Sequence, residues 1–121
     1  MDQICLIMPV LPSRADDARA FMRELDRDRM AEYDSSEQRI GIDKEVWFLA
    51  SGPQDLSLVA YIEAADFARA LEQFSGSEDE FDQWFKSRLA DVTGIDLNNP
   101  PAMTLPELLS TYSATSATAS A

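Results

Sequence analysis

Two apolar segments joined by a short turn constrain the fold of this chain more than any other feature. The segments "EVWFLAS" (45–51) and "LSLVAYIE" (56–63) flank "GPQD" (52–55). The Gly and Pro of the middle segment are typical of a turn between paired strands. The sequence therefore predicts a β-hairpin near the centre of the chain.

Both faces of the first hairpin strand are apolar. Trp47 and Leu49 point to one side, and Val46, Phe48 and Ala50 point to the other. A sheet covered on a single face alternates apolar with polar residues, so we expect a cover on each face here. Helices can cover one face, and a second copy of the chain is the simplest cover for the other.

The remaining periodicity predicts one α+β domain over residues 1–112. The expected elements are a strand at 3–10, a helix from 13 that "DSS" (34–36) ends, the two hairpin strands, a helical region from 66 to 94 split at 75–77, and a last strand at 105–112. The order β-α-β-β-α(α)-β is that of a ferredoxin-like sandwich, with a four-stranded antiparallel sheet and helices on one face. "LPELLSTY" (105–112) equally suits a helix start. The tail "SATSATASA" (113–121) has the composition of a disordered segment.

Charge and composition exclude several classes of function. The formal charge is −12, which disfavours binding to nucleic acids or to anionic membrane surfaces. The chain has no histidine and one cysteine, so it has no Ser-His-Asp triad, imidazole metal site or cysteine cluster. We expect no metal and no cofactor. With no signal-peptide pattern and no long apolar run, we expect a cytoplasmic protein.

Three segments resemble known proteins. "MPVLPSRADDARAF" (8–21) resembles the strand–Pro–helix start of the dimeric α+β barrel group, which includes antibiotic-biosynthesis-type monooxygenases and small cyclases. "YDSSEQRIGIDKEVWFLAS" (33–51) and "FDQWFKSRLADVTGIDL" (81–97) resemble a small bacterial family of unknown function. The wider resemblance implies a homodimer through back-to-back sheets, and a pocket between each sheet and its helices. It supplies no catalytic residues to carry over.

The first candidate site lies where the first helix leaves its apolar face. If that helix keeps its phase, Arg29, Glu32 and Tyr33 continue the face of Phe21 and Leu25. In the functional interpretation they form the polar rim of a pocket, with Tyr33 as proton donor and Glu32 as base. In the alternative, the helix outruns the core and these residues meet water.

A second candidate pair lies on the second hairpin strand. Tyr61 and Glu63 share one face of that strand. A carboxylate beside a phenol on a half-buried strand can act as a general base. The alternative is an interface tyrosine beside an exposed acid at the strand end.

Aromatic residues and one arginine complete the candidate ligand-binding set. Trp47, Phe81 and Trp84 either line an apolar pocket or pack in the core. Arg39 either binds a ligand carboxylate or forms a structural ion pair. The acidic run "SEDEFD" (77–82) is explained by helix capping without a metal ion.

These observations lead to two functional hypotheses. The first is a homodimer that binds an apolar or aromatic small molecule between sheet and helices. If it is also catalytic, we expect a cofactor-independent enzyme of specialised metabolism, with cyclisation, isomerisation or oxygenation as its reaction. The second is a non-catalytic carrier, accessory or regulatory module with an acidic interaction surface. An enclosed cavity of several hundred Å³ with convergent polar groups favours the first hypothesis.

Overall fold

The computed structural model describes residues 1–114 of the chain as an α+β domain. Most of the tail expected at 113–121 lies outside the described residues. The elements are β1 (Asp2–Pro9), α1 (Ala15–Asp26), α2 (Met30–Ile40), β2 (Ile42–Ser51), β3 (Leu56–Ala64), α3 (Phe67–Ser75) and α4 (Glu80–Thr93). None of the helices in this part of the chain is long and apolar enough to cross a membrane.

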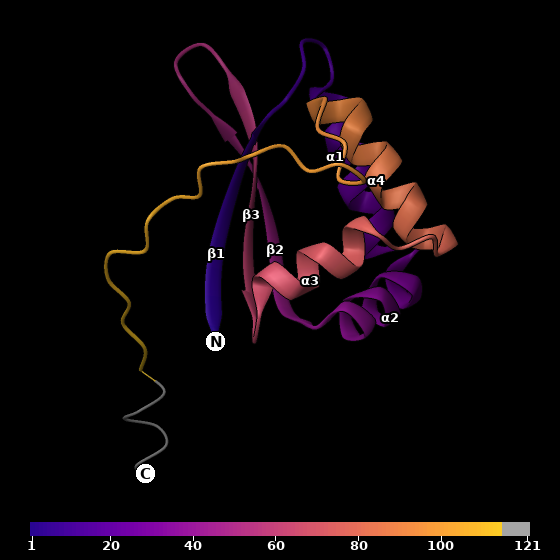
Figure 1. Ribbon diagram of the computed structural model, residues 1–121. Coiled ribbons are helices and arrows are strands. Elements are labelled where there is room, and N and C mark those ends of the chain that lie inside the picture. The colour runs from indigo at the N-terminus through magenta and orange to yellow at the C-terminus, as the bar shows by residue number, and fades with distance from the viewer. Residues whose placement is uncertain (115–121) are drawn as a thin grey trace.

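The three strands form one antiparallel sheet in the order β1-β3-β2. The predicted hairpin is confirmed: β2 and β3 pair along their length, and the Gly52 amide closes the turn on the Asp55 carbonyl at 2.7 Å. Tyr61 at the centre of β3 lies between Cys5 of β1 and Val46 of β2. All four helices lie on one side of this sheet (Figure 1).

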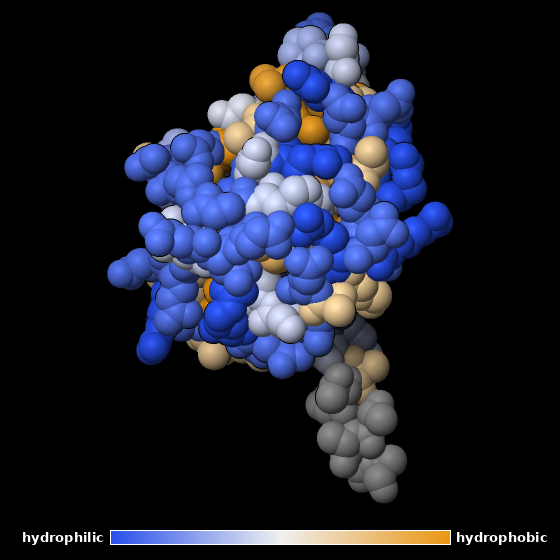
Figure 2. Space-filling model, turned by 90° about the vertical axis from the view of Figure 1, so that its right-hand side faces the viewer, coloured by the Kyte–Doolittle hydropathy of each residue, from blue (hydrophilic) through white to orange (hydrophobic). Residues whose placement is uncertain are grey.

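The core fills the space between the sheet and the helices. Leu58, Ala60 and Ile62 of β3 face it, because alternate residues of a strand point to the same side. From the helices, Phe21 and Leu89 are fully buried against them. The opposite side of the helical layer is largely hydrophilic (Figure 2).

The outer face of the sheet has no cover within the described residues, although it is apolar. Ile7 and Phe48 lie on either side of Val59 on this face, and both are 57% exposed. Val46 and Tyr61 form the next row and are half-buried. The expectation of two apolar faces is thus confirmed, while its cover by a second copy stays a prediction.

The expected end of the first helix at 34–36 is wrong. The chain instead breaks after Asp26, and α2 then runs through "DSS" to Ile40. Ser36 is tolerated inside α2 because its hydroxyl is fully buried and donates to Asp82 of α4. Gly41 ends α2 with a left-handed backbone, φ 91°, that favours glycine.

The fourth strand expected at Leu105–Tyr112 is also wrong, and so is the alternative of a helix. Within the described chain, residues 99–114 form neither helix nor strand, so the ferredoxin-like order is incomplete. Pro100, Pro101 and Pro106 remove three amide donors that regular structure would need. The helical region from 66 to 94 is split as predicted, with Asp66 capping α3 and Gly94 ending α4.

Candidate functional site

Four side chains of α2 and β2 converge at the edge of the sheet. Tyr33 and Glu37 are four residues apart, so they share one face of α2. Glu45 and Trp47 are two residues apart on β2 and share its inner face. We call these four residues the α2–β2 cluster.

The Glu45 carboxylate is the acceptor at the centre of this cluster. Its Oε2 atom accepts hydrogen bonds from the Tyr33 hydroxyl and from the Trp47 indole Nε1, the latter at 3.0 Å. The same indole N–H also lies 3.3 Å from the Tyr33 hydroxyl oxygen. Two donors therefore stabilise the ionised form of Glu45.

The Glu37 carboxyl lies beside that of Glu45 and holds a proton at neutral pH. Burial, and then the neighbouring Glu45, raise the pKa of Glu37 to about 9. Burial also raises the pKa of Glu45, against the donors that lower it. Two interacting buried carboxyls do not both ionise readily, so the pair shares one proton. The Oε2 atom of Glu37 is buried and has no hydrogen-bond partner.

Tyr33 supplies a neutral phenol to the cluster. Burial and the adjacent Glu45 raise the pKa of its hydroxyl above the ordinary value. The phenol therefore stays protonated and acts as a hydrogen-bond donor. The arrangement combines a carboxylate, a carboxylic acid and a phenol, which are the groups of general acid–base chemistry.

The cluster separates an inner apolar cavity from two hollows on the surface. The cavity has a volume of about 60 Å³, and Glu37 and Glu45 are the only ionisable residues that the described chain contributes to its wall. One hollow of about 410 Å³ and another of about 250 Å³ both reach Tyr33 and Glu45 from outside. The inner cavity is smaller than the several hundred Å³ expected for an enzyme pocket, whereas the two hollows are in or near that range.

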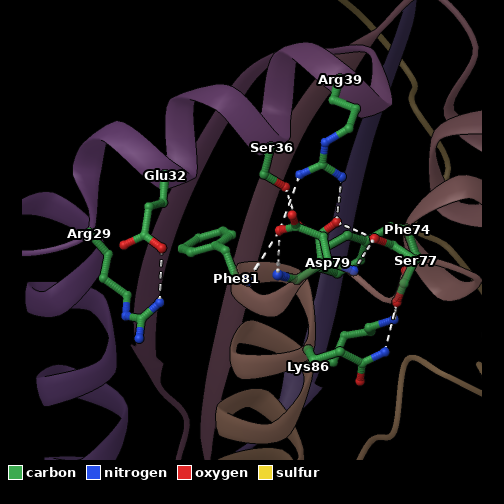
Figure 3. A network of polar contacts seen from close by, with 11 residues as sticks. Arg29, Glu32, Ser36, Arg39, Phe74, Ser77, Asp79, Phe81 and Lys86 are labelled. Carbon is green, nitrogen blue, oxygen red and sulfur yellow. Dashed lines mark hydrogen bonds and ion pairs between the residues drawn. The ribbon is translucent and has the colours of Figure 1, made fainter.

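An ionic network around the buried carboxylate of Asp82 connects α2 to α4 (Figure 3). Because α2 also carries Tyr33 and Glu37, this network positions half of the cluster. The carboxylate of Asp82, which is fully buried, accepts from Ser36 at 2.5 Å, Arg39 at 2.6 Å and Ser77 at 2.6 Å. Burial acts against ionisation, but these three donors outweigh it and lower the pKa of Asp82. Asp82 therefore stays a carboxylate at neutral pH.

Lys86 joins the same region to the end of α3. Its fully buried ammonium donates to the carbonyls of Phe74 at 2.8 Å, Ser75 at 3.2 Å and Ser77 at 3.0 Å. These carbonyls lie at the C-terminal end of a helix, where a positive charge is favourable. Among the described residues, no group of three or more Asp, Glu or Cys side chains has metal-binding geometry.

Of the first predicted triplet, only Tyr33 belongs to the α2–β2 cluster. Arg29 pairs with Glu32 at 3.3 Å and with Glu80 at 3.6 Å, and its guanidinium lies 4.4 Å from the Trp84 ring centre. Glu32 is exposed, and its carboxylate accepts the hydrogen bond from Arg29 (Figure 3). The assumed continuous helix phase is wrong because the chain breaks between α1 and α2.

Tyr61 and Glu63 lie on the outer face of the sheet, away from the cluster. The Tyr61 hydroxyl donates to Glu63 at 2.7 Å, and this bond, ahead of burial, raises the pKa of Tyr61. The two residues are neighbours as predicted, but the sheet separates them from Tyr33.

Of the predicted ligand-binding residues, one belongs to the α2–β2 cluster and the others lie outside it. Trp47 belongs to the cluster, whereas Phe81 and Trp84 pack in the core with ring centres 5.6 Å apart. Arg39 lies in the last turn of α2 and forms ion pairs with Asp82 at 2.6 Å and with Asp79 at 3.4 Å.

Glu37 and Glu45 were missed from the sequence, although a signal for each was present. Glu45, Trp47 and Leu49 are alternate residues of the same strand, so the three side chains share one face, and an acid stands on a face that is otherwise apolar. Glu37 is one helical turn beyond Tyr33. Because the sequence predicted a helix end at 34–36, Tyr33 and Glu37 were not expected to lie on the same helix.

No family model and no curated protein matches the sequence. Among solved structures, the fold is similar to that of tetracenomycin F2 cyclase from Streptomyces glaucescens, a type II polyketide cyclase. The TM-score is 0.54 at 17% sequence identity, over 94% of this chain and 99% of that chain. The resemblance to small cyclases of the α+β barrel group is thus confirmed at the level of fold, which does not by itself assign a reaction.

Proposed function

We propose that this protein is a cofactor-independent acid–base enzyme that acts on an uncharged, apolar carbonyl compound. The single observation that carries the proposal is the placement of two carboxyls, Glu37 and Glu45, side by side in the wall of an apolar cavity, where burial raises the pKa of each. Perturbed carboxyl pairs of this kind are characteristic of sites that move protons. Their placement beside an aromatic wall fits a ligand with an apolar body.

The proposed reaction begins with Glu45 as the base. Its carboxylate takes a proton from a carbon next to a carbonyl, and the resulting enolate carbon attacks a second carbonyl of the same molecule. Glu37 gives its proton to the oxygen of that second carbonyl, which becomes a hydroxyl. One C–C bond forms, and a proton passes from Glu45 back to Glu37. The Tyr33 hydroxyl and the Trp47 N–H stabilise the Glu45 carboxylate.

The substrate would enter from the two surface hollows on either side of Tyr33. Their volumes of about 410 and 250 Å³ are in or near the range of small-molecule sites, unlike the inner cavity of about 60 Å³. The unpartnered Oε2 of Glu37 offers a hydrogen-bonding position to a ligand. Cyclisation is favoured over the other reactions because the similar solved structure is that of a polyketide cyclase.

The proposed assembly is a homodimer through the outer face of the sheet. Ile7 and Phe48 are large apolar side chains that remain more than half exposed on that face. Covering them with the same face of a second copy would remove apolar surface from water in a two-fold arrangement.

The function can be tested by deuterium exchange into 2-tetralone, an uncharged bicyclic ketone with acidic C–H groups. We expect the wild-type chain to accelerate exchange in D₂O, as followed by NMR, by roughly 100-fold or more over buffer. Glu45→Gln should return the rate to that of buffer. Glu72→Gln, a change on the exposed side of α3, should leave the rate unchanged.

Two results would overturn the proposal. One is a wild-type rate equal to that of buffer. The other is loss of activity in Glu63→Gln together with full activity in Glu45→Gln, which would move the chemistry to the outer face of the sheet.

A further inference from the structure

The segment that follows α4 contains an apolar arm that has no hydrogen-bond or ion-pair partner among residues 1–114. We call residues 104–112 the C-terminal arm. Leu97 and Met103, just before it, pack against the core and line the inner cavity. Beyond them, Leu108, Leu109 and Tyr112 are 58%, 84% and 89% exposed.

The backbone of the arm is also unsatisfied. In the described part of the chain, residues 100–112 make no hydrogen bond and no ion pair. Exposed leucines and a tyrosine on an extended, unpaired backbone are typical of a segment that docks on another surface. Figure 1 shows the arm running past the edge strand β1 and continuing beyond it, away from the helices.

A groove on that side of the sheet has the complementary character. It has a volume of about 450 Å³ and lies between Ile7 and Val59 of the outer face and hairpin residues 50–55. We call it the hairpin groove. Among residues 1–114, Asp55 is the only charged residue that lines it.

We propose that the C-terminal arm of each protomer docks in the hairpin groove of a second copy. This inference rests on the sheet-paired homodimer of the proposed function, and does not depend on the acid–base chemistry. The arm runs toward the end of the sheet opposite the β2–β3 hairpin (Figure 1), so it leads away from its own groove. A two-fold axis that makes the facing strands antiparallel brings the partner's hairpin to that end.

The charge distribution favours a second copy as the occupant. Each chain carries a formal charge of −12, so most surfaces of two copies repel each other. The arm and the hairpin groove are exceptions, because each contains a single acidic residue, Glu107 and Asp55. The two copies can therefore meet there with little repulsion, and the leucines of the arm gain apolar contacts.

The first test changes the apolar character of the arm. We expect the full chain to be a dimer in sedimentation equilibrium, and the double variant Leu108→Ser, Leu109→Ser to raise the dimer dissociation constant by roughly 100-fold or more. The control Ser110→Ala, Thr111→Ala changes the same arm without removing a large apolar side chain. It should leave the constant within about threefold.

The second test locates the arm on the partner. In a Cys5→Ser background, one chain carries Leu109→Cys and the other carries Gln54→Cys at the rim of the hairpin groove. On mixing and mild oxidation, we expect a disulfide-linked heterodimer to form faster than with Glu72→Cys, which lies on the helical side.

The outcomes separate this inference from the proposed function. A dimer that the leucine substitutions do not weaken, or equal cross-linking at the two cysteine positions, would overturn the docking of the arm and leave the sheet-paired dimer intact. A monomeric wild-type chain would overturn the dimer and the docked arm together. Neither result bears on the exchange activity of Glu45.

Discussion

At the scale of single residues, the pair Glu37 and Glu45 makes the folded state hold a proton that the unfolded chain has lost. The pKa of Glu37 is about 9 in the folded protein, against an ordinary value of 4.5. Below pH 4.5, Glu37 is protonated in both the folded and the unfolded chain, and its favourable contribution to the free energy of unfolding is fully present. As the pH rises through the folded pKa, that contribution is lost, so stability falls across this window.

Replacing Glu37 by glutamine should therefore flatten the pH dependence of stability. We expect wild-type stability from urea unfolding to decrease between pH 5 and pH 8, and Glu37→Gln to show a much smaller decrease. At pH 8 the variant should be the more stable protein by about 1–3 kcal/mol, allowing for the half-buried position of the side chain. The exposed Glu72→Gln is the control. If the stability of Glu37→Gln decreased with pH as steeply as that of the wild type, the raised pKa of Glu37 would be contradicted.

The candidate site could be predicted only in part, because its residues come from two segments with different periods. Tyr33 and Trp47 stand out in the sequence as aromatic residues on apolar faces, and both belong to the cluster. The approach of Glu37 to Glu45 depends on how α2 lies on β2. That packing depends on the break after Asp26 and on contacts with α4, which no local pattern specifies.

At the scale of the elements, Asp82 is the contact that fixes α2 relative to α4. Its carboxylate is fully buried and accepts hydrogen bonds from Ser36 and Arg39 of α2 and from Ser77, which lies between α3 and α4. Because those donors lower the pKa of Asp82, its contribution to stability is present at neutral pH and is lost as the pH falls through the lowered value. Removing the carboxylate leaves Ser36 without its partner in a buried place.

We therefore expect Asp82→Ala to destabilise the protein strongly. The loss should be about 3–5 kcal/mol in urea unfolding at pH 7, because three hydrogen bonds to a charged group disappear and the buried Ser36 hydroxyl loses its acceptor. Asp91→Ala, on the exposed side of the same helix, should change stability by less than about 0.5 kcal/mol. Similar effects of the two substitutions would show that the network does not hold the helices together.

The elements themselves were predictable wherever the apolar period was strong and uninterrupted. The hairpin and α3 have such periods, and both are confirmed. Leu108 and Leu109 are exposed and do not pack on the rest of the described chain, so the apolar pattern at 105–112 did not specify a strand. The spacing of apolar residues in the sequence shows which side chains are suited to burial. It does not show whether they pack against their own chain or against a second one.

At the scale of the whole molecule, the two sides of the sheet differ in the polarity of the surface that they present to water. The helical side presents a largely hydrophilic surface to water (Figure 2). The opposite side exposes Ile7 and Phe48, in a chain whose net charge otherwise keeps copies apart. A dimer through this face would bury the apolar side chains and keep the charged helices outside.

Phe48→Lys should break the proposed dimer without unfolding the protomer. The phenylalanine is 57% exposed in the single chain, so its loss costs the protomer little, whereas a lysine there would be buried without a partner between two sheets. We expect sedimentation equilibrium to show a monomer at micromolar concentration, with far-UV circular dichroism unchanged. Glu72→Lys makes the same kind of charge change on the helical side and should remain a dimer. If Phe48→Lys stayed dimeric with wild-type affinity, the outer sheet face would not be the interface, and the exposed apolar row across β1, β3 and β2 would need a different partner.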